Sequence, residues 1–405
     1  MGLLRHFVRD DRGHVAVIGA LALPILIGGI AFGTEAGDWL VEKTKLSFVA
    51  DATVLSAGQL YNRGKTEAQI ATILRAKLVA DGYPDASLAL NLTYPDAASD
   101  QITAEISYSP DKYFAQAIWD GAVVIRARTV AVMEGDEACV LALNPTASGA
   151  VTVGGSATMS LTGCVVASNS SSTSSVYMGG SSTLTTECII SSGGINGEAH
   201  ATTQCQKNRT YRRPTPDPFA DLTQPATPGH CHNPPNFNPT GTYSVSAGCY
   251  DHDFDVKGTV TFGSGVYILD GADLKINSSA IVTGTDVTFV LKNGAELNFN
   301  GGATINLTAP EAGSAEPYPG ILFWGSDTNN ASHKINGDAS SVFAGAIYMP
   351  DDAVEFTGSS GMDSACTRVV ADTITLSGNT GFETDCSDEL GAYDLSTAQT
   401  VIIVE

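Results

Sequence analysis

The sequence predicts a mainly β protein with three parts. These are an N-terminal transmembrane helix, a small α+β membrane-proximal unit, and a right-handed parallel β-helix or β-solenoid-like ectodomain. Three observations lead to this fold class. One long apolar run lies near the N-terminus. The chain has 42 Gly and only 16% charged residues, a composition typical of many short strands and turns. Weak repeats recur every 20 to 25 residues or so, a period typical of stacked repeat units.

The apolar run is the candidate membrane anchor. It occupies the segment 15–33, which begins VAVIGALALPILIGGIAF and follows a basic start, 1–14. About 18 uncharged residues at 1.5 Å per residue are enough to cross the hydrocarbon core of a bilayer. Because basic residues precede the run, we expect the N-terminus in the cytoplasm and the rest of the chain on the other side. The anchor candidates are Val15, Ile18, Leu21, Leu23, Pro24, Ile25, Leu26, Ile30 and Phe32.

Two other interpretations of this run remain open. A cleaved signal peptide also contains an apolar stretch, but this stretch is long and no A-x-A site follows it directly. A buried helix of a soluble protein is the second alternative.

The segment 34–137 is expected to continue the helix and then form the α+β unit. Apolar residues at helical spacing extend the helix to about Tyr61, and 65–79 predicts a second helix. LALNLTYP and ITAEISYSP alternate like paired strands, AVVIRARTVAV predicts a third strand, and 113–119 predicts a short helix.

The repeats define the ectodomain, 138–390. VTVGGSATMSLTGC, which starts at Val151, resembles VYMGGSSTLTTEC, which starts at Val176. LKINSSAIVTG resembles LNFNGGATINL, and KINGDASSVFAG resembles EFTGSSGMDSAC. Stacked strands with alternate residues in a shared core would explain these pairs, and a β-sandwich with coincidental Gly and Ser turns is the alternative. Matching positions hold Asn277, Asn300 and Asn336, which are candidates for a side-chain ladder.

A proline-rich insertion, 206–256, interrupts the repeats. Proline cannot donate to a strand ladder, so we expect a long loop that crosses the solenoid face and is held by Cys205, Cys231 and Cys249. The segment 391–405 is expected to form a C-terminal strand or tail.

The charge of the chain argues against two classes of partner. The net charge is −22, with 21 Lys and Arg against 43 Asp and Glu. Such a field repels nucleic acid and anionic lipid headgroups from the ectodomain. No P-loop, G-x-S-x-G, H-E-x-x-H or Rossmann fingerprint is present, so we expect no enzyme, no catalytic residue and no cofactor.

The cysteines all lie beyond the apolar run, and their even number suggests disulfides. Eight cysteines allow 105 connectivities, and proximity in the sequence favours neighbouring partners. The favoured pairs are Cys139–Cys164, Cys188–Cys205, Cys231–Cys249 and Cys366–Cys386.

Two polar clusters offer alternatives to a purely structural ectodomain. His230, Cys231, His232 and His252 are a possible metal site, but they have no C-x-x-C partner, so we expect none. Carboxylates at two places resemble the acid and base groups of polysaccharide-active β-helix enzymes, but a lone D-x-D is a weak signal and solvated or turn carboxylates are the favoured explanation. They are Asp251, Asp253, Asp255, Asp351 and Asp352.

Several residues of the N-terminal segment form a pattern: Arg12 and Gly13 before VAV, Pro24 in the apolar helix, Glu35 after it, and Ala50-Asp51-Ala52. With this pattern the segment resembles the N-terminal region of TadG-like proteins of the Tad/Flp pilus assembly system. The segments YFAQAIWDGAVVIRARTVAV, GVYILDG, YPGILFW and AGAIYMPDDAVEFTG also resemble regions of that family, so the likeness covers most of the chain.

The resemblance implies a membrane-anchored, non-enzymatic envelope protein that assists assembly or anchoring of an adhesive pilus. It implies a bacterial inner membrane, a periplasmic C-terminal region with possible surface exposure, and other pilus-assembly or pilin-like proteins as partners. Gly13–His14 is a possible processing site, although Ile18 stands where processed pilin-like proteins carry Glu. A polysaccharide-binding or polysaccharide-degrading β-helix and a secreted surface adhesin are the alternative functions.

Overall fold

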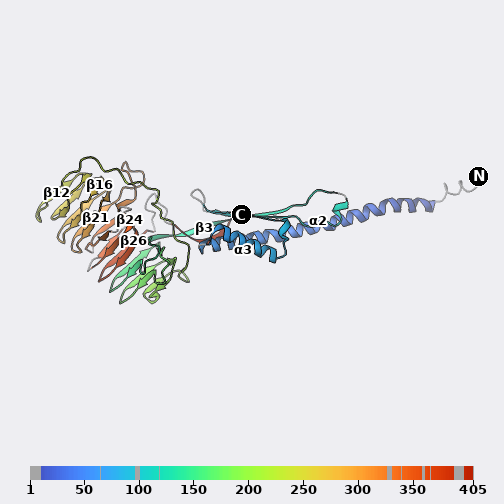
Figure 1. Cartoon of the computed structure of the whole chain (residues 1–405), viewed down its shortest axis with the longest axis horizontal. Helices are drawn as coiled ribbons and strands as arrows, with labels where there is room; N and C mark the ends of the chain where they lie inside the picture. Colours follow the sequence, from blue (N-terminus) through green and yellow to red (C-terminus); the bar gives the residue numbers. More distant parts are fainter. Residues whose placement is uncertain are drawn as a thin grey trace, which may run out of the picture. The chain divides into compact units, whose positions relative to one another are not determined.

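The computed structural model describes residues 11–63, 65–95, 101–117, 119–325, 331–338, 340–357, 361–364, 366–386 and 396–404. The described chain is mainly β, with a long apolar N-terminal helix and parallel sheets, as the sequence predicts (Figure 1). It divides into two compact units, Met1–Glu134 with Thr400–Glu405, and Gly135–Gln399.

The first unit is built on one unbroken helix, α2 (Asp11–Asn62). The predicted anchor and the predicted continuation are therefore parts of a single element, and Pro24 lies inside it without ending it. Its second half packs into the unit, with Leu46, Ala50 and Val54 fully buried. None of the side chains in 17–32 of this helix is buried.

A small α+β arrangement packs on the second half of α2. The helix α3 (Glu67–Ala80) begins with a capping box between Thr66 and Gln69. The strands β1 (Leu88–Thr93), β2 (Gln101–Tyr108) and the first part of β3 (Ile125–Ala142) pair antiparallel, in that order. The predicted helix at 113–119 is reduced to a single 3-10 turn, η2 (Ala115–Ala117), and η1 (Asp85–Ser87) is another.

The second unit consists of short strands in successive groups of three, which we call layers. Corresponding strands of neighbouring layers pair in parallel. The strands that precede the proline-rich segment, after β3, are β4 (Val151–Val153), β5 (Thr158–Thr162), β6 (Val165–Ser168), β7 (Val176–Met178), β8 (Thr183–Thr186), β9 (Ile189–Ser191), β10 (Ile195–Asn196) and β11 (Ala201–Thr203), with the turn η3 (Glu198–His200). Those that follow it are β12 (Thr242–Val245), β13 (Gly248–Tyr250), β14 (Phe254–Val256), β15 (Thr259–Phe262), β16 (Gly265–Asp270), β17 (Leu274–Ile276), β18 (Ile281–Gly284), β19 (Val287–Lys292), β20 (Leu297–Phe299), β21 (Thr304–Thr308), β22 (Ile321–Trp324), β23 (Ser332–Lys334), β24 (Val342–Phe356), β25 (Gly361–Ser364), β26 (Thr367–Leu376) and β27 (Gly381–Asp385). The last strand, β28 (Ser396–Ile403), has its final residues, from Thr400 on, in the first unit.

The repeated segments of the sequence lie on neighbouring layers. Val151 pairs with Val176, Leu274 pairs with Leu297, and Lys334 pairs with Glu355. The repeated Gly-Gly-Ser turn has a conformational reason, because Gly155 and Gly180 both have positive φ. A Cβ on Gly180 would also lie 2.6 Å from the carbonyl oxygen of Gly155 in the next layer.

The order of the layers differs from the order of the sequence. Layers follow one another from β12 to β26, and β26 then pairs with the end of β3 and with β4. The next layer, the end of β3 with β4 and β5, comes from a distant and earlier part of the chain, since β27 pairs with β5 in the same step. We call this joint, where 367–386 meets 138–162, the seam. The chain thus enters the array of layers at an interior position.

Aromatic rings fill the interior of the layers that follow the proline-rich segment. Tyr267 and Phe289 stack with ring centroids 5.0 Å apart, and Phe289 and Phe323 stack at 5.4 Å. All three side chains are fully buried. Asn277 and Asn300 occupy matching positions, but each donates to a backbone carbonyl of the preceding layer, Val256 or Ile276, rather than to another asparagine.

The proline-rich segment crosses from one end of the array to the other. Thr215 exchanges hydrogen bonds with the side chain of Asn169, Asp217 accepts from Tyr348, and Gln224 donates to Gly325. This agrees with a loop that crosses the strands, but the predicted insertion, 206–256, is too long. Its last part forms the regular layer β12–β14, because the prolines end at Pro239 and apolar residues then alternate.

Candidate functional site

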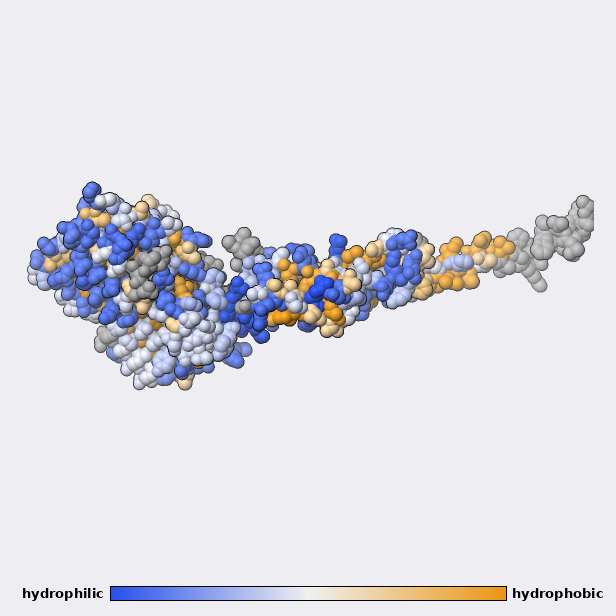
Figure 2. Space-filling view, in the orientation of Figure 1, coloured by the Kyte–Doolittle hydropathy of each residue, from blue (hydrophilic) through white to orange (hydrophobic). Residues whose placement is uncertain are grey.

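The first half of α2 presents an apolar surface that no other described part of the protein covers (Figure 2). It belongs to a helix long and apolar enough to span a membrane, Val17–Asn62, and its most apolar stretch is not buried. The exposed fractions of the anchor side chains range from 46% for Phe32 to 75% for Ile25. Gly13, His14 and Val15 lie in the helical backbone, whereas residues 1–10 lie outside the described residues. The large exposed anchor residues are Ile18, Leu21, Leu23, Ile25, Leu26, Ile30 and Phe32.

Glu35 marks the point where α2 joins the rest of its unit. Its carboxylate accepts hydrogen bonds from the backbone N–H groups of Tyr113 at 2.7 Å, Phe114 at 2.9 Å and Ala115 at 2.6 Å. It is almost completely buried, and it satisfies the free N–H groups at the start of η2. One side chain therefore ties the segment between β2 and β3 to the helix.

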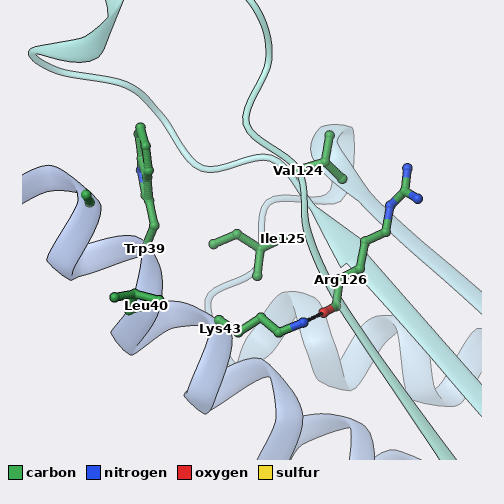
Figure 3. Close-up of a pocket in the computed structure, with 7 residues that line it drawn as sticks. Trp39, Leu40, Lys43, Val124, Ile125 and Arg126 are labelled. Carbon is green, nitrogen blue, oxygen red and sulfur yellow. Dashed lines mark hydrogen bonds between the residues drawn. The ribbon is translucent and has the colours of Figure 1, made fainter.

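An apolar pocket of about 660 Å³ lies between α2 and the start of β3 (Figure 3). Trp39, Leu40 and Ile125 line it, and Lys43 closes one side by donating to the carbonyl oxygen of Arg126 at 2.7 Å. Its lining is mostly apolar, so the pocket is suited to an apolar partner.

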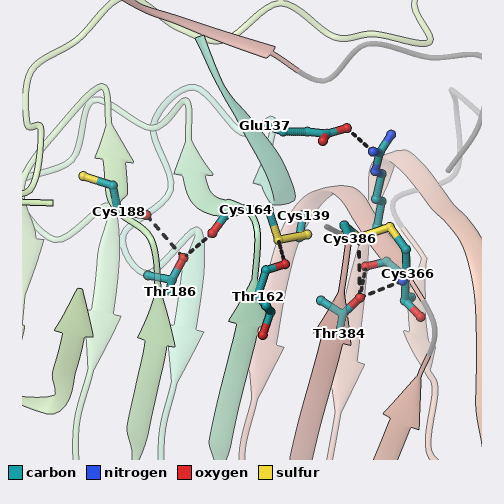
Figure 4. The surroundings of a disulfide bond; sticks show 11 residues. Glu137, Cys139, Thr162, Cys164, Thr186, Cys188, Cys366, Thr384 and Cys386 are labelled. Carbon is teal, nitrogen blue, oxygen red and sulfur yellow. Dashed lines mark hydrogen bonds and ion pairs between the residues drawn. A yellow bond between two sulfur atoms is a disulfide. The ribbon is translucent and has the colours of Figure 1, made fainter. Parts of the chain in front are cut away.

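Four disulfides brace the second unit, and two of them lie at the seam (Figure 4). The pairs are Cys139–Cys164, Cys188–Cys205, Cys231–Cys249 and Cys366–Cys386, the same pairs that proximity in the sequence favours. Arg368 also pairs with Glu137 at the seam. The ion pair thus joins strands from distant parts of the chain, whereas each of these two disulfides braces one side of the seam.

The histidines considered as metal ligands are not brought together. Cys231 is bonded to Cys249, so it supplies no thiolate. His232 lies against the ring of Tyr250, and His252 contacts Asp251 at 2.8 Å. Among the described residues, Cys139, Cys164 and Cys386 are the one group with metal-ligand spacing, and all three are in disulfides.

The alternating carboxylates do line a common pocket. Asp251, Asp253 and Asp255 surround a polar pocket of about 660 Å³ beside the segment 233–237, whereas Asp351 is not among its lining residues. Asp253 contacts Lys275 at 2.8 Å and accepts from the N–H of Asp273 at 3.0 Å.

The chemistry of this polar pocket does not favour acid catalysis. The hydrogen bond from Lys275, with that from the backbone of Asp273, lowers the pKa of Asp253 despite partial desolvation. The hydrogen bonds from Lys257 and Asn277 lower the pKa of Asp255 in the same way. A general acid needs a raised pKa, so these carboxylates are suited to holding charge at neutral pH.

Sequence reasoning missed a buried Asp–His pair. His333 lies 3.2 Å from Asp352 and accepts from the N–H of Leu297, and Asp352 also accepts from the N–H of Ala331 at 2.6 Å. Both side chains are at most 1% exposed. We find no nucleophile in contact with this pair among the described residues, and its hydrogen bonds join three segments of the array.

Comparisons with protein-family models, with curated proteins and with solved structures find no match to this chain.

Proposed function

We propose that the protein is a membrane-anchored, non-enzymatic envelope protein that assists assembly or anchoring of a Tad/Flp-type pilus. The observation that carries the anchoring is the uncovered apolar half of α2, continuous with a folded second half. In this proposal the N-terminus is cytoplasmic and the second unit lies in the periplasm, where disulfides form.

The pilus assignment depends on the residues that resemble the TadG-like N-terminal region. Three of them make specific contacts. Glu35 binds the start of η2, Ala50 is fully buried, and Asp51 accepts from Thr129 at 2.8 Å. These contacts support the idea that the shared residues preserve a membrane-proximal unit of this type.

In the same proposal, the layers of the second unit form a right-handed parallel β-helix that acts as a rigid interaction surface. Parallel pairing in nearly constant register, a continuous apolar interior and four disulfides favour this role. The paired carboxylates of the polar pocket favour binding over catalysis.

The anchor is tested with Leu23→Arg and Leu26→Arg in one variant. Each arginine at the centre of a span costs about 2.5–3.5 kcal/mol on insertion scales, so the double variant should leave the membrane fraction after a carbonate wash. Phe48→Arg is the matched control, because Phe48 is 70% exposed on the same helix beyond the apolar run. Retention of the double variant in the washed membrane would refute the anchor.

The pilus role is tested by deleting the gene in its host and counting surface pili by electron microscopy. We expect the full chain, but not the double arginine variant, to restore them. Unchanged piliation after deletion would refute the pilus role and leave the anchor untouched.

A further inference from the structure

Three large aromatic side chains are exposed in one short segment of the first unit. Between β2 and β3, Tyr113 is 71% exposed, Phe114 is 55% exposed and Trp119 is 49% exposed. Aromatic side chains bury much of their area in soluble proteins, so three such rings together indicate a surface that meets something apolar. We call Tyr113, Phe114 and Trp119, with Phe32 and Trp39 of α2, the aromatic cluster.

The aromatic cluster lies where the apolar run of α2 ends. Glu35, which binds the N–H groups of Tyr113 and Phe114, comes three residues after Phe32, about 4.5 Å along the helix axis. Phe32 and Trp39 contact each other edge to face, with ring centroids 6.3 Å apart. The exposed rings are therefore at the level where the helix would leave the hydrocarbon.

Cations accompany these rings although the chain as a whole is acidic. The ammonium of Lys112 lies 5.5 Å from the centroid of the Trp119 ring and donates to the carbonyl oxygens of Trp119 and Gly121. Lys43 and Arg126 lie together beside Trp39 at the rim of the apolar pocket. Rings with a polar edge next to basic side chains match the headgroup region of a phospholipid bilayer.

We infer that the aromatic cluster is a membrane-interface contact, which lies among phospholipid headgroups and fixes the depth at which α2 is inserted. This inference rests on the proposed membrane anchor. The bilayer is favoured over a protein partner because Phe32 and Trp39, two turns apart on the same face of α2, extend the apolar surface of the helix into the aromatic cluster. Glu35 is the positioning residue, since it holds the rings of the loop beside the helix.

The test measures the depth of single rings in the full chain. The protein is reconstituted in phosphatidylcholine vesicles whose acyl chains carry bromine either near the headgroup or near the bilayer centre. Shallow bromine should quench part of the tryptophan fluorescence, and Trp119→Phe should remove much of that quenching. A Leu23→Trp reporter should be quenched best by deep bromine. Trp324, which is 3% exposed in the second unit, should contribute to neither signal.

The outcomes separate the two proposals. If the Leu23→Trp reporter is not quenched, the anchor is wrong and this inference falls with it. If that reporter is quenched but Trp119 is quenched by neither lipid, or best by deep bromine, the anchor stands and the interface contact is refuted. Glu35→Ala should reduce the shallow quenching of Trp119 while leaving the deep quenching of Leu23→Trp unchanged. Loss of both signals in that variant would contradict a positioning role.

Discussion

The seam offers the sharpest test of the layered arrangement. Cys366→Ala with Cys386→Ala removes the bridge that ties β27 to the preceding layer. The matched control is Cys231→Ala with Cys249→Ala, at the first layer of the array. The two bridges close loops of similar length, with sequence separations of 20 and 18.

The expected loss of free energy follows from loop closure. For loops of this length, the chain-entropy relation gives about 3 kcal/mol for each bridge, roughly a 100-fold change in the unfolding equilibrium. The two losses of free energy from loop closure are nearly equal. Any difference in how far unfolding spreads in the two variants therefore comes from the position of the bridge in the array. Layers contact only their neighbours, so a destabilised end layer unfolds alone. A destabilised seam instead separates two blocks of layers, the early block 138–203 and the late block 242–385.

Hydrogen exchange with mass spectrometry on the full chain in detergent measures this difference. We expect the seam variant to lose amide protection in β27, β5 and β26 together, and the control variant to lose it only in β12 to β14. Mass after alkylation confirms that the other three bridges remain. If amide protection is lost only in β27, the seam does not couple the two blocks. The same conclusion follows if the loss of protection spreads equally far in the control variant.

Three further predictions concern single side chains. Phe289→Ala empties the centre of the aromatic stack and should lower the free energy of unfolding by about 3–5 kcal/mol in guanidinium denaturation. Asp352→Ala leaves His333 and the partly buried N–H of Ala331 without their acceptor, so thermal unfolding should show a loss of about 1–3 kcal/mol. Asp253 has its pKa lowered by Lys275, so the unfolded chain binds the proton more readily and the contribution of Asp253 to stability is present above its ordinary range. The difference in the free energy of unfolding between the wild type and Asp253→Asn should stay within about 1 kcal/mol, decline as the pH falls below about 4, and vanish only below the lowered pKa of the folded state; a constant difference would contradict this origin.

Local patterns predicted much of this structure. The helix α2, the antiparallel strands of the first unit and the pairing of Val151 with Val176 follow from periodicity within short windows. The same holds for Leu274 with Leu297. Such features are readable because the residues that interact are repeated copies of one pattern.

The seam could not be predicted in this way. Val369 pairs with Val140, and neither segment resembles the other closely enough to indicate the contact. The layer β12–β14 was also not predicted. The many prolines in 206–239 led to the prediction of a loop that also included the strand residues that follow. The role of Glu35 depends on a segment almost 80 residues away, and the sequence around 113–119 predicted a helix rather than a hydrogen-bonded turn.

The interior entry point of the chain has a consequence for the order of folding. A ribosome delivers 138–203 before 242–385, yet the strands that cover one side of the earlier block, β26 and β27, are among the last to emerge. Until β26 and β27 have been synthesised, the early block has one apolar face exposed. It therefore cannot complete its packing during translation of the residues that precede them. A chain that stops short of β26 would lack the middle of the array rather than an end. Nascent chains of increasing length should therefore gain protease resistance in one late step, near residue 386, instead of one increment per layer.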